Sequence, residues 1–296
     1  MNKKVIASFM AMVMVLSMMT GSIQASAKGK SNYSKYNNTK CGFGLSLNTS
    51  HKKPGYSKAR GVSKLSKYNA YYMNESAAKK KKKVIYLTFD CGYENGHTKR
   101  ILNILKKNKI KAIFFVTEPY IRSNPKLVKR MKKEGHLVGN HTCTHPQLPT
   151  RSVTQIKKEV NNCAKTMKKL TGYKMDKYIR PPEGCYSQRT LKVLQDMGYA
   201  TMFWSLAWHD WDPKHQPGKT AVVKKFKKYY HPGMMPLIHV VSQSDTQALP
   251  DVIKFMKKKG YRFGEVTDFA LRPGEKKSSS QTNKKAAESV SVDNDK

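Results

Sequence analysis

Residues 84–271 alternate between short apolar runs and longer runs whose apolar residues recur with helical spacing. This alternation is typical of βα units, which build a parallel sheet with helices packed against it. Seven strands and six helices fit into this segment, which favours one compact barrel, complete or incomplete, over two domains. We therefore predict an α/β fold of the distorted (β/α)7 barrel type.

The apolar pattern also gives approximate limits for each element. The predicted strands are residues 84–89, 112–116, 137–140, 178–180, 201–206, 235–240 and 262–266. The predicted helices are residues 98–107, 125–134, 153–170, 188–197, 220–230 and 246–259. Ser152 and Gln155 have the spacing of a capping box at the start of the third helix.

Residues 1–27 have the pattern of a secretory signal peptide. Lys3 and Lys4 precede a charge-free apolar run over residues 5–19, and small residues at 25–27 have cleavage-site spacing. The run is shorter than the roughly 20 residues that a spanning helix needs, so we predict cleavage and not an anchor. The mature chain is then secreted and has no stable membrane span.

The segments that flank the predicted barrel differ from it in composition. Residues 28–83 are rich in Lys, Ser, Asn and Tyr, and they predict a basic N-terminal extension that wraps the core and ends in a linker. Residues 272–296 lack aromatic side chains and have little apolar content, so we predict a disordered tail.

The chain is strongly basic, with 57 Lys and Arg against 19 Asp and Glu and a net charge of +38 at pH 7. Such an excess favours a polyanionic partner. Nucleic acid is one candidate, but an exported chain meets anionic cell-wall polymers instead. We therefore predict those polymers as partners and no nucleic acid, although runs such as 79–83 are also typical of solvated faces.

Polar residues of chemical interest end or follow five of the predicted strands. In chain order they are Asp90, His141, His145, Arg180, Asp210 and His239. Taken singly, each has a structural explanation, such as a helix cap, a hydrogen-bonded loop histidine or a rigid turn. The carboxyl ends of parallel strands meet at one rim, however, and core packing gives no reason for these residue types there. We therefore predict one site that contains all six.

The spacing of these residues indicates what each can do. His141 and His145 are four apart, so both imidazoles can bind one metal ion. Two prolines stiffen the backbone behind Arg180, as expected for a guanidinium that orients a carboxylate. Trp208 and Trp211 flank Asp210, and indole rings suit sugar faces, although aromatic residues are as often part of a core.

These motifs, in this order, resemble those of the polysaccharide deacetylases with a NodB homology domain, carbohydrate esterase family 4. The matching motifs are Thr88-Phe89-Asp90, His141-xxx-His145, Arg180-Pro181-Pro182-Glu183-Gly184, Asp210-Trp211 and Leu237-Ile238-His239. The resemblance covers residues 84–271 and implies the barrel of that family. Shorter motifs at 92–96, 139–141, 204–207 and 231–233, with 67–72 in the extension, are similar to the PdaA-type branch.

The resemblance implies a catalytic set. A divalent metal ion bound by His141 and His145 activates water while Asp90 takes the proton. Zn²⁺ is the first choice for this ion, and Co²⁺ and Mn²⁺ are the alternatives. His239 protonates the leaving amine. Arg180 orients Asp90, and Asp210 either holds Arg180 or tunes His239. The resemblance also implies an oxyanion-binding N–H near Cys185 or Tyr186.

The sequence departs from the family pattern at Cys91, where most members have a metal-binding Asp. A thiolate can bind Zn²⁺, whereas an unligated thiol leaves two histidines and waters around the ion. For substrate binding we predict Tyr93, Tyr186, Trp208 and Trp211.

The branch implies a function: a monomeric, metal-dependent hydrolase that removes acetyl groups from N-acetylmuramic acid in peptidoglycan glycan strands, toward muramic δ-lactam in spore cortex. Two alternatives stay open. One is a deacetylase of another N-acetylated polysaccharide with GlcNAc units, and the other is a non-catalytic relative that only binds cell wall.

Overall fold

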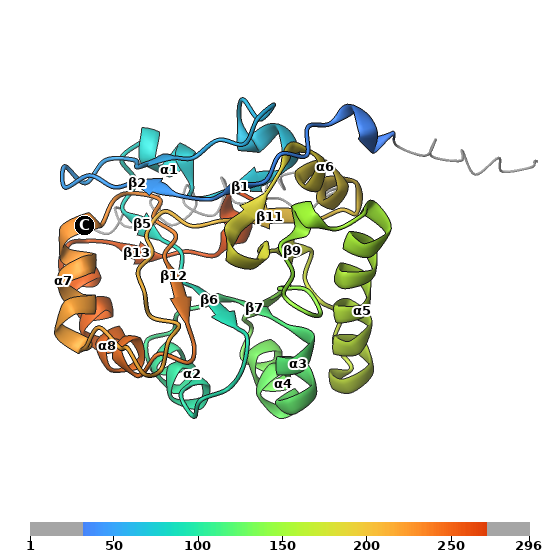
Figure 1. Ribbon diagram of the computed structural model, residues 1–296. Helices are drawn as coiled ribbons and strands as arrows, with labels where there is room; N and C mark the ends of the chain where they lie inside the picture. The colour runs from blue at the N-terminus through green and yellow to red at the C-terminus, as the bar shows by residue number, and fades with distance from the viewer. Residues whose placement is uncertain (1–31, 271–296) are drawn as a thin grey trace, which may run out of the picture. The chain divides into compact units, whose positions relative to one another are not determined.

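A curled parallel sheet of seven strands organises the computed structural model, which describes residues 32–270 (Figure 1). Neighbouring strands across the sheet are β12 (Leu237–His239), β6 (Thr88–Cys91), β7 (Ile113–Val116), β8 (Leu137–Asn140), β9 (Tyr178–Ile179), β11 (Ala200–Met202) and β4 (Ala70–Tyr71). Every pairing within this sheet is parallel. The predicted α/β barrel-type fold is confirmed.

Helices surround the convex side of this sheet (Figure 1). They are α2 (Thr98–Lys107), α3 (Glu118–Ser123), α4 (Pro125–Lys133), α5 (Val153–Thr171), α6 (Gln188–Asp196), α7 (Lys219–Tyr229) and α8 (Gln243–Lys258). The capping box of α5 is present, with the Ser152 and Gln155 side chains each bound to the other's backbone N–H. Apolar side chains of the helices and of the strand faces toward them form the largest core cluster.

The membership of the sheet differs from the prediction. The predicted last strand, β13 (Arg262–Phe263), pairs with β5 (Val84–Ile85) and lies outside the seven-stranded sheet. The seventh strand is β4, which comes from the N-terminal extension and pairs with β11. The predicted strand 84–89 is divided into β5, which pairs with β13, and β6, which pairs with β7 and β12.

The extension packs closely on the barrel. It holds α1 (Glu75–Lys79), the short hairpin of β2 (Leu45–Ser46) and β3 (Gly55–Tyr56), and β1 (Cys41–Gly42), which pairs with β10 (Cys185–Tyr186). Phe43 of this segment is buried and stacks on Phe203, with ring centroids 4.3 Å apart. The extension therefore completes a second core cluster.

Two predictions fall on residues that the structure does not describe. The signal peptide and the tail from residue 272 lie within 1–31 and 271–296. Within residues 32–270, no helix is long and apolar enough to cross a membrane.

Candidate active site

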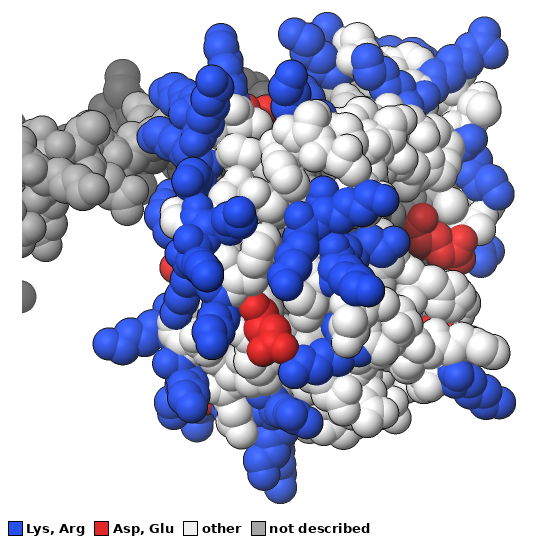
Figure 2. Space-filling model, turned by 90° about the vertical axis from the view of Figure 1, so that its left-hand side faces the viewer, with Lys and Arg blue, Asp and Glu red and all other residues white. Residues whose placement is uncertain are grey.

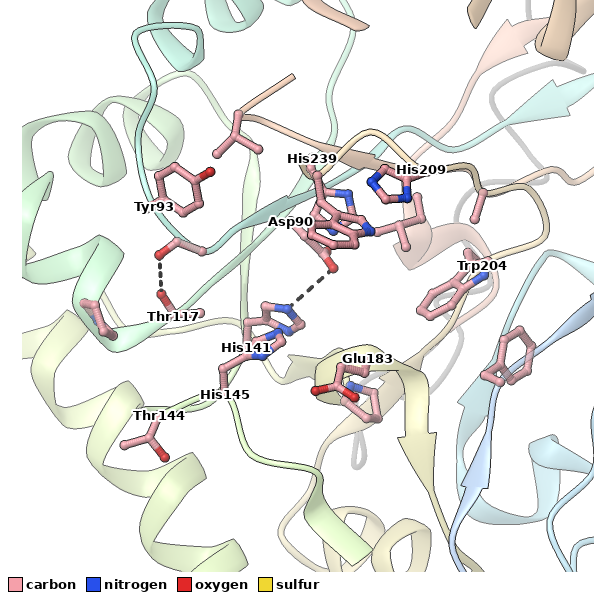
Figure 3. Close-up of a pocket in the computed structure, with 18 of the residues that line it drawn as sticks. Asp90, Tyr93, Thr117, His141, Thr144, His145, Glu183, Trp204, His209 and His239 are labelled. Atoms are coloured by element: carbon pink, nitrogen blue, oxygen red, sulfur yellow. Dashed lines mark hydrogen bonds and ion pairs between the residues drawn. The ribbon is translucent and has the colours of Figure 1, made fainter. Parts of the chain in front are cut away.

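A cavity of about 1040 Å³ opens at the carboxyl ends of the strands (Figure 3). Its lining includes four residues predicted for catalysis or metal binding, Asp90, His141, His145 and His239, and three predicted for substrate binding, Tyr93, Trp208 and Trp211. The register of the sheet brings two of these residues together, because His239 on β12 pairs with Asp90 on β6. Side chains from distant parts of the chain therefore meet in one pocket.

Asp90 is the penultimate residue of β6 and is held by a buried guanidinium. Its side chain points to the same face of the strand as that of Thr88, as the period of two requires. Arg180 is fully buried; its Nη1 lies 2.6 Å from Asp90 Oδ1, and its Nη2 donates to Thr88 Oγ1 at 2.7 Å. Burial would raise the pKa of Asp90, but the charges of Arg180, His141 and His239 outweigh it and lower that pKa. Arg180 thus holds an ionised carboxylate in the cavity.

His141 follows β8 with one ring nitrogen fixed. Its Nδ1 lies 2.8 Å from the carbonyl oxygen of Arg180, an acceptor, so Nδ1 carries the proton and Nε2 offers a lone pair. Burial lowers the pKa of His141 to about 4. His141 Nε2 lies 3.5 Å from Asp90 Oδ2 (Figure 3). Two acceptors therefore face each other across a short gap.

His145 reaches the same place through a turn of unusual backbone shape. Thr142 and His145 have φ of 70° and 57°, in the left-handed region. Asn140 holds the turn, since its Oδ1 accepts from the N–H of Thr142 at 2.8 Å. The turn brings the rings of His141 and His145 to 4.8 Å between centroids.

His239 forms a pair with Asp210. His239 Nδ1 lies 2.7 Å from Asp210 Oδ1, and the His239 backbone N–H donates to Asp210 Oδ2 at 2.8 Å. Burial would lower the pKa of His239, but the neighbouring Asp210 carboxylate raises it. Asp210 is fully buried and bonds to His239. Of the two roles expected for Asp210, the geometry favours tuning His239 over holding Arg180.

Arg180 and Asp210 lie behind the cavity wall, where they bond to Asp90 and His239. Two further predicted residues, Cys91 and Tyr186, do not line the cavity either. Cys91 follows Asp90 directly, so its side chain points to the opposite face of β6 and is buried in the largest core cluster. Burial raises the pKa of the Cys91 thiol well above its usual value. Tyr186 is also fully buried; its hydroxyl donates to the Ser57 carbonyl at 2.7 Å, so its side chain cannot contact substrate in this structure.

The three other aromatic residues predicted to bind substrate line the cavity. Tyr93 and Trp211 are half exposed, at 51% and 55%, and Trp208 is partly buried. Sequence reasoning did not single out Trp204 and Glu183, which also line the cavity (Figure 3). Glu183 has φ of 56°, and its place in the Arg180-Pro181-Pro182-Glu183-Gly184 motif was the available signal.

The side chains present fit a divalent cation with few protein ligands. Among residues 32–270, no group of three or more His, Cys, Asp or Glu side chains is arranged to hold a metal ion. His141 and His145 offer two imidazoles, and the carbonyl bond to His141 Nδ1 is the support typical of metal-binding histidines. The opposed lone pairs of His141 Nε2 and Asp90 Oδ2 also suit a cation or a water between them.

Comparison with known proteins agrees with this geometry. The sequence pattern of the family described as polysaccharide deacetylase matches residues 77–202. The peptidoglycan-N-acetylmuramic acid deacetylase PdaA of Bacillus subtilis is 40% identical over 226 residues, which cover 76% of this chain and 84% of that protein. This chain belongs to the polysaccharide deacetylase family.

The solved structure of Bacillus subtilis PdaA, a family 4 carbohydrate esterase, matches this polysaccharide deacetylase with a TM-score of 0.73 over 79% of this chain and 97% of that chain. A peptidoglycan-N-acetylglucosamine deacetylase of Bacillus cereus is 32% identical over 63% of this chain and 87% of that protein. A family 4 pseudoenzyme of Bacillus anthracis is 28% identical, with a TM-score of 0.61 over 68% of each chain. Because the family contains both enzymes and a pseudoenzyme, family membership alone does not show whether this protein is catalytically active.

Proposed function

We propose that this protein is a secreted, metal-dependent hydrolase that removes the acetyl group from N-acetylmuramic acid in peptidoglycan glycan strands. The observation that carries the proposal is the convergence of Asp90, His141, His145 and His239 on one cavity. Support for the muramic unit comes from the likeness to PdaA. A free amine on that sugar can close to muramic δ-lactam, so we place the reaction in spore cortex.

The reaction adds water across the amide. The water oxygen bonds to the acetyl carbon, the carbon–nitrogen bond breaks, and acetate and a sugar amine are formed. Asp90 is the base that takes the proton of the attacking water, and Arg180 holds its Oδ1 so that Oδ2 faces His141. His239 delivers a proton to the leaving nitrogen, supported by Asp210. His141 and His145 would hold a divalent ion, Zn²⁺ before Co²⁺ or Mn²⁺, which supplies Lewis acidity.

The rim of the cavity suits a glycan. Tyr93 and Trp211 present exposed rings beside the catalytic side chains, and aromatic rings offer an apolar face with large contact area to a sugar. We assign substrate contacts to Tyr93, Trp208 and Trp211. Tyr186 has no such role because its side chain is buried.

Metal removal and replacement test this assignment. Acetate release from purified glycan strands should stop with a chelator and return with Zn²⁺ or Co²⁺, and His141→Ala should abolish the recovery. Binding of Zn²⁺ alone, measured by calorimetry, should weaken in the same variant. His215→Ala is the matched control, because His215 is exposed and lies outside the cavity lining. Acetate release that survives chelation would refute metal dependence.

A non-catalytic cell-wall binder is the second candidate, favoured by Cys91 at the position of the family's metal-binding Asp. In that case glycan binding continues with and without metal, and no acetate forms under any condition. Cys91→Asp would not separate the two, because the side chain at position 91 points into the core, where a carboxylate would be buried away from the two imidazoles.

We also propose anionic cell-wall polymers as partners of the face formed by α7 and α8. Figure 2 shows that Lys and Arg side chains crowd this side of the molecule. Lys227, Lys254, Lys258 and Lys259 line a hollow of about 610 Å³ around Phe255. Asp251 also lines it, but it already pairs with Lys219 at 2.8 Å. The hollow therefore presents ammonium groups to a chain of phosphates or carboxylates.

A pair of variants with equal charge tests this surface. One changes the four lysines of the hollow to Gln, and the other changes four exposed lysines elsewhere, namely Lys158, Lys165, Lys169 and Lys174. Binding to a poly(glycerol phosphate) polymer should weaken much more in the first. Equal losses would show that only the total charge matters, and stronger retention of DNA than of the polymer would favour nucleic acid.

A further inference from the structure

Asp245 is a buried acid that the proposed reaction does not use directly. It lies in the first turn of α8, and only 4% of its surface is exposed. Its Oδ1 accepts a hydrogen bond from the indole Nε1 of Trp208 at 3.2 Å. Its Oδ2 is fully buried and has no donor among residues 32–270. An oxygen in this condition is costly unless something satisfies it.

Helix capping does not explain this carboxyl. An acid three residues into a helix usually turns back to the N-cap backbone N–H. Here that N–H, on Ser242, donates to the His239 carbonyl at 3.1 Å. The Ser242 side chain accepts from the Asp245 backbone N–H, so the carboxyl of Asp245 itself takes no part in the cap.

Contacts through neighbouring residues connect Asp245 to a second carboxyl, that of Asp210. Asp245 bonds to Trp208, two residues before Asp210, and the N-cap of its helix bonds to His239, which pairs with Asp210. Asp210 receives two N–H donors from His239 and so carries the negative charge of the pair. No Lys, Arg or His side chain in residues 32–270 forms an ion pair with Asp245. Burial, followed by the hydrogen bond and charge of Asp210, raises the pKa of Asp245 well above its usual value. Two neighbouring buried carboxyls without a cation between them do not both ionise, so one keeps its proton.

We propose that Asp245 is a positioning residue whose protonated Oδ2 donates a hydrogen bond to Asp210 while its Oδ1 accepts from Trp208. This arrangement satisfies the buried Oδ2. One acid then fixes both the Asp210–His239 pair and the indole that lines the cavity. The consequence for catalysis rests on the proposed function, in which His239 is the general acid.

Asp245→Asn provides the decisive comparison. An Asn side chain is neutral, donates to Asp210 through Nδ2 and accepts from Trp208 through Oδ1, so it reproduces the proposed bonding. We expect unchanged acetate release and an unchanged pH profile of kcat. Asp245→Ala removes both bonds, and we expect kcat to fall about 10-fold to 100-fold, as for other supporting groups.

Infrared difference spectroscopy tests the protonation state without relying on activity. The wild type minus Asp245→Asn spectrum at neutral pH should show the loss of a protonated carboxyl band. Asp251→Asn, on the exposed side of the same helix, is the control and should lose a carboxylate band instead. The proposal is overturned if Asp245→Asn loses a carboxylate band, as the control does, and not a protonated carboxyl band. It is also overturned if Asp245→Asn lowers the pKa that controls the alkaline limb of kcat by about one unit or more. Absence of acetate release in the wild type would refute the proposed function but leave the infrared result decisive.

Discussion

Replacing Arg180 by Met tests whether the site depends on a buried charge pair. Arg180 is fully buried, 2.6 Å from Asp90 Oδ1, and also donates to Thr88 Oγ1 at 2.7 Å and to the Phe203 carbonyl at 2.9 Å. Met keeps much of the apolar length but donates nothing. Removing one partner of a buried pair costs about 3–5 kcal/mol, because the other charge is left unpaired. We expect the free energy of unfolding to fall by that amount.

Urea unfolding followed by circular dichroism at neutral pH measures this loss. Arg122→Met is the matched control, because Arg122 pairs with Glu118 at the surface, where such a pair contributes about 0.3–0.5 kcal/mol. Asp90→Asn leaves the buried Arg180 charge without its counter-ion, so it should also lower the free energy of unfolding, but by less than Arg180→Met because an amide oxygen still accepts from Arg180, and it should lose acetate release. A loss below about 1 kcal/mol for Arg180→Met, similar to that of the control, would refute the role of the pair.

Three further predictions follow from the same structure. Burial lowers the pKa of His231 to about 4, against about 6.5 in an unfolded chain, so unfolding takes up a proton below about pH 6.5. The free energy of unfolding should therefore fall by up to about 3 kcal/mol as the pH drops from about 6.5 to 4. Urea unfolding at several pH values should show a smaller fall for His231→Asn, and an equal fall would contradict this. Gly139→Ala places a Cβ 2.7 Å from the Phe115 ring and 2.9 Å from the Tyr178 carbonyl, so it should cost about 1–3 kcal/mol, and an unchanged Tm would be the contrary result. Trp211→Ala should raise KM for glycan with little change in kcat, because its ring lies exposed at the cavity wall; a selective fall in kcat would instead place Trp211 in the chemistry.

The six longer helices could be predicted from the sequence because their signals are local, whereas the short helices α1 and α3, of five and six residues, were not predicted. The limits of α2 agree with the prediction at both ends, and α5 begins at the capping box read from Ser152 and Gln155. Strands were harder, because pairing and not periodicity decides where a ladder ends. β4 has only two residues, too few to show the alternation of a strand, so its place beside β11 is set by the packing of the extension.

The candidate site was predictable where chemistry coincides with strand ends. Asp90 and His239 were expected at one rim, and the sheet register places them side by side. Cys91 lies one residue further on, on the opposite face, which follows from strand alternation once the position of Asp90 is known. Asp245 was missed because an acid at the start of a helix ordinarily indicates a cap, and only three-dimensional contacts show its bond to Trp208.

Mass spectrometry of purified glycan strands after incubation with the protein tests the central claim most directly. We expect loss of acetyl from muramic units and not from glucosamine units in the wild type, and no such product with Asp90→Asn. Loss of acetyl from glucosamine units alone, or equal product from wild type and Asp90→Asn, would contradict it.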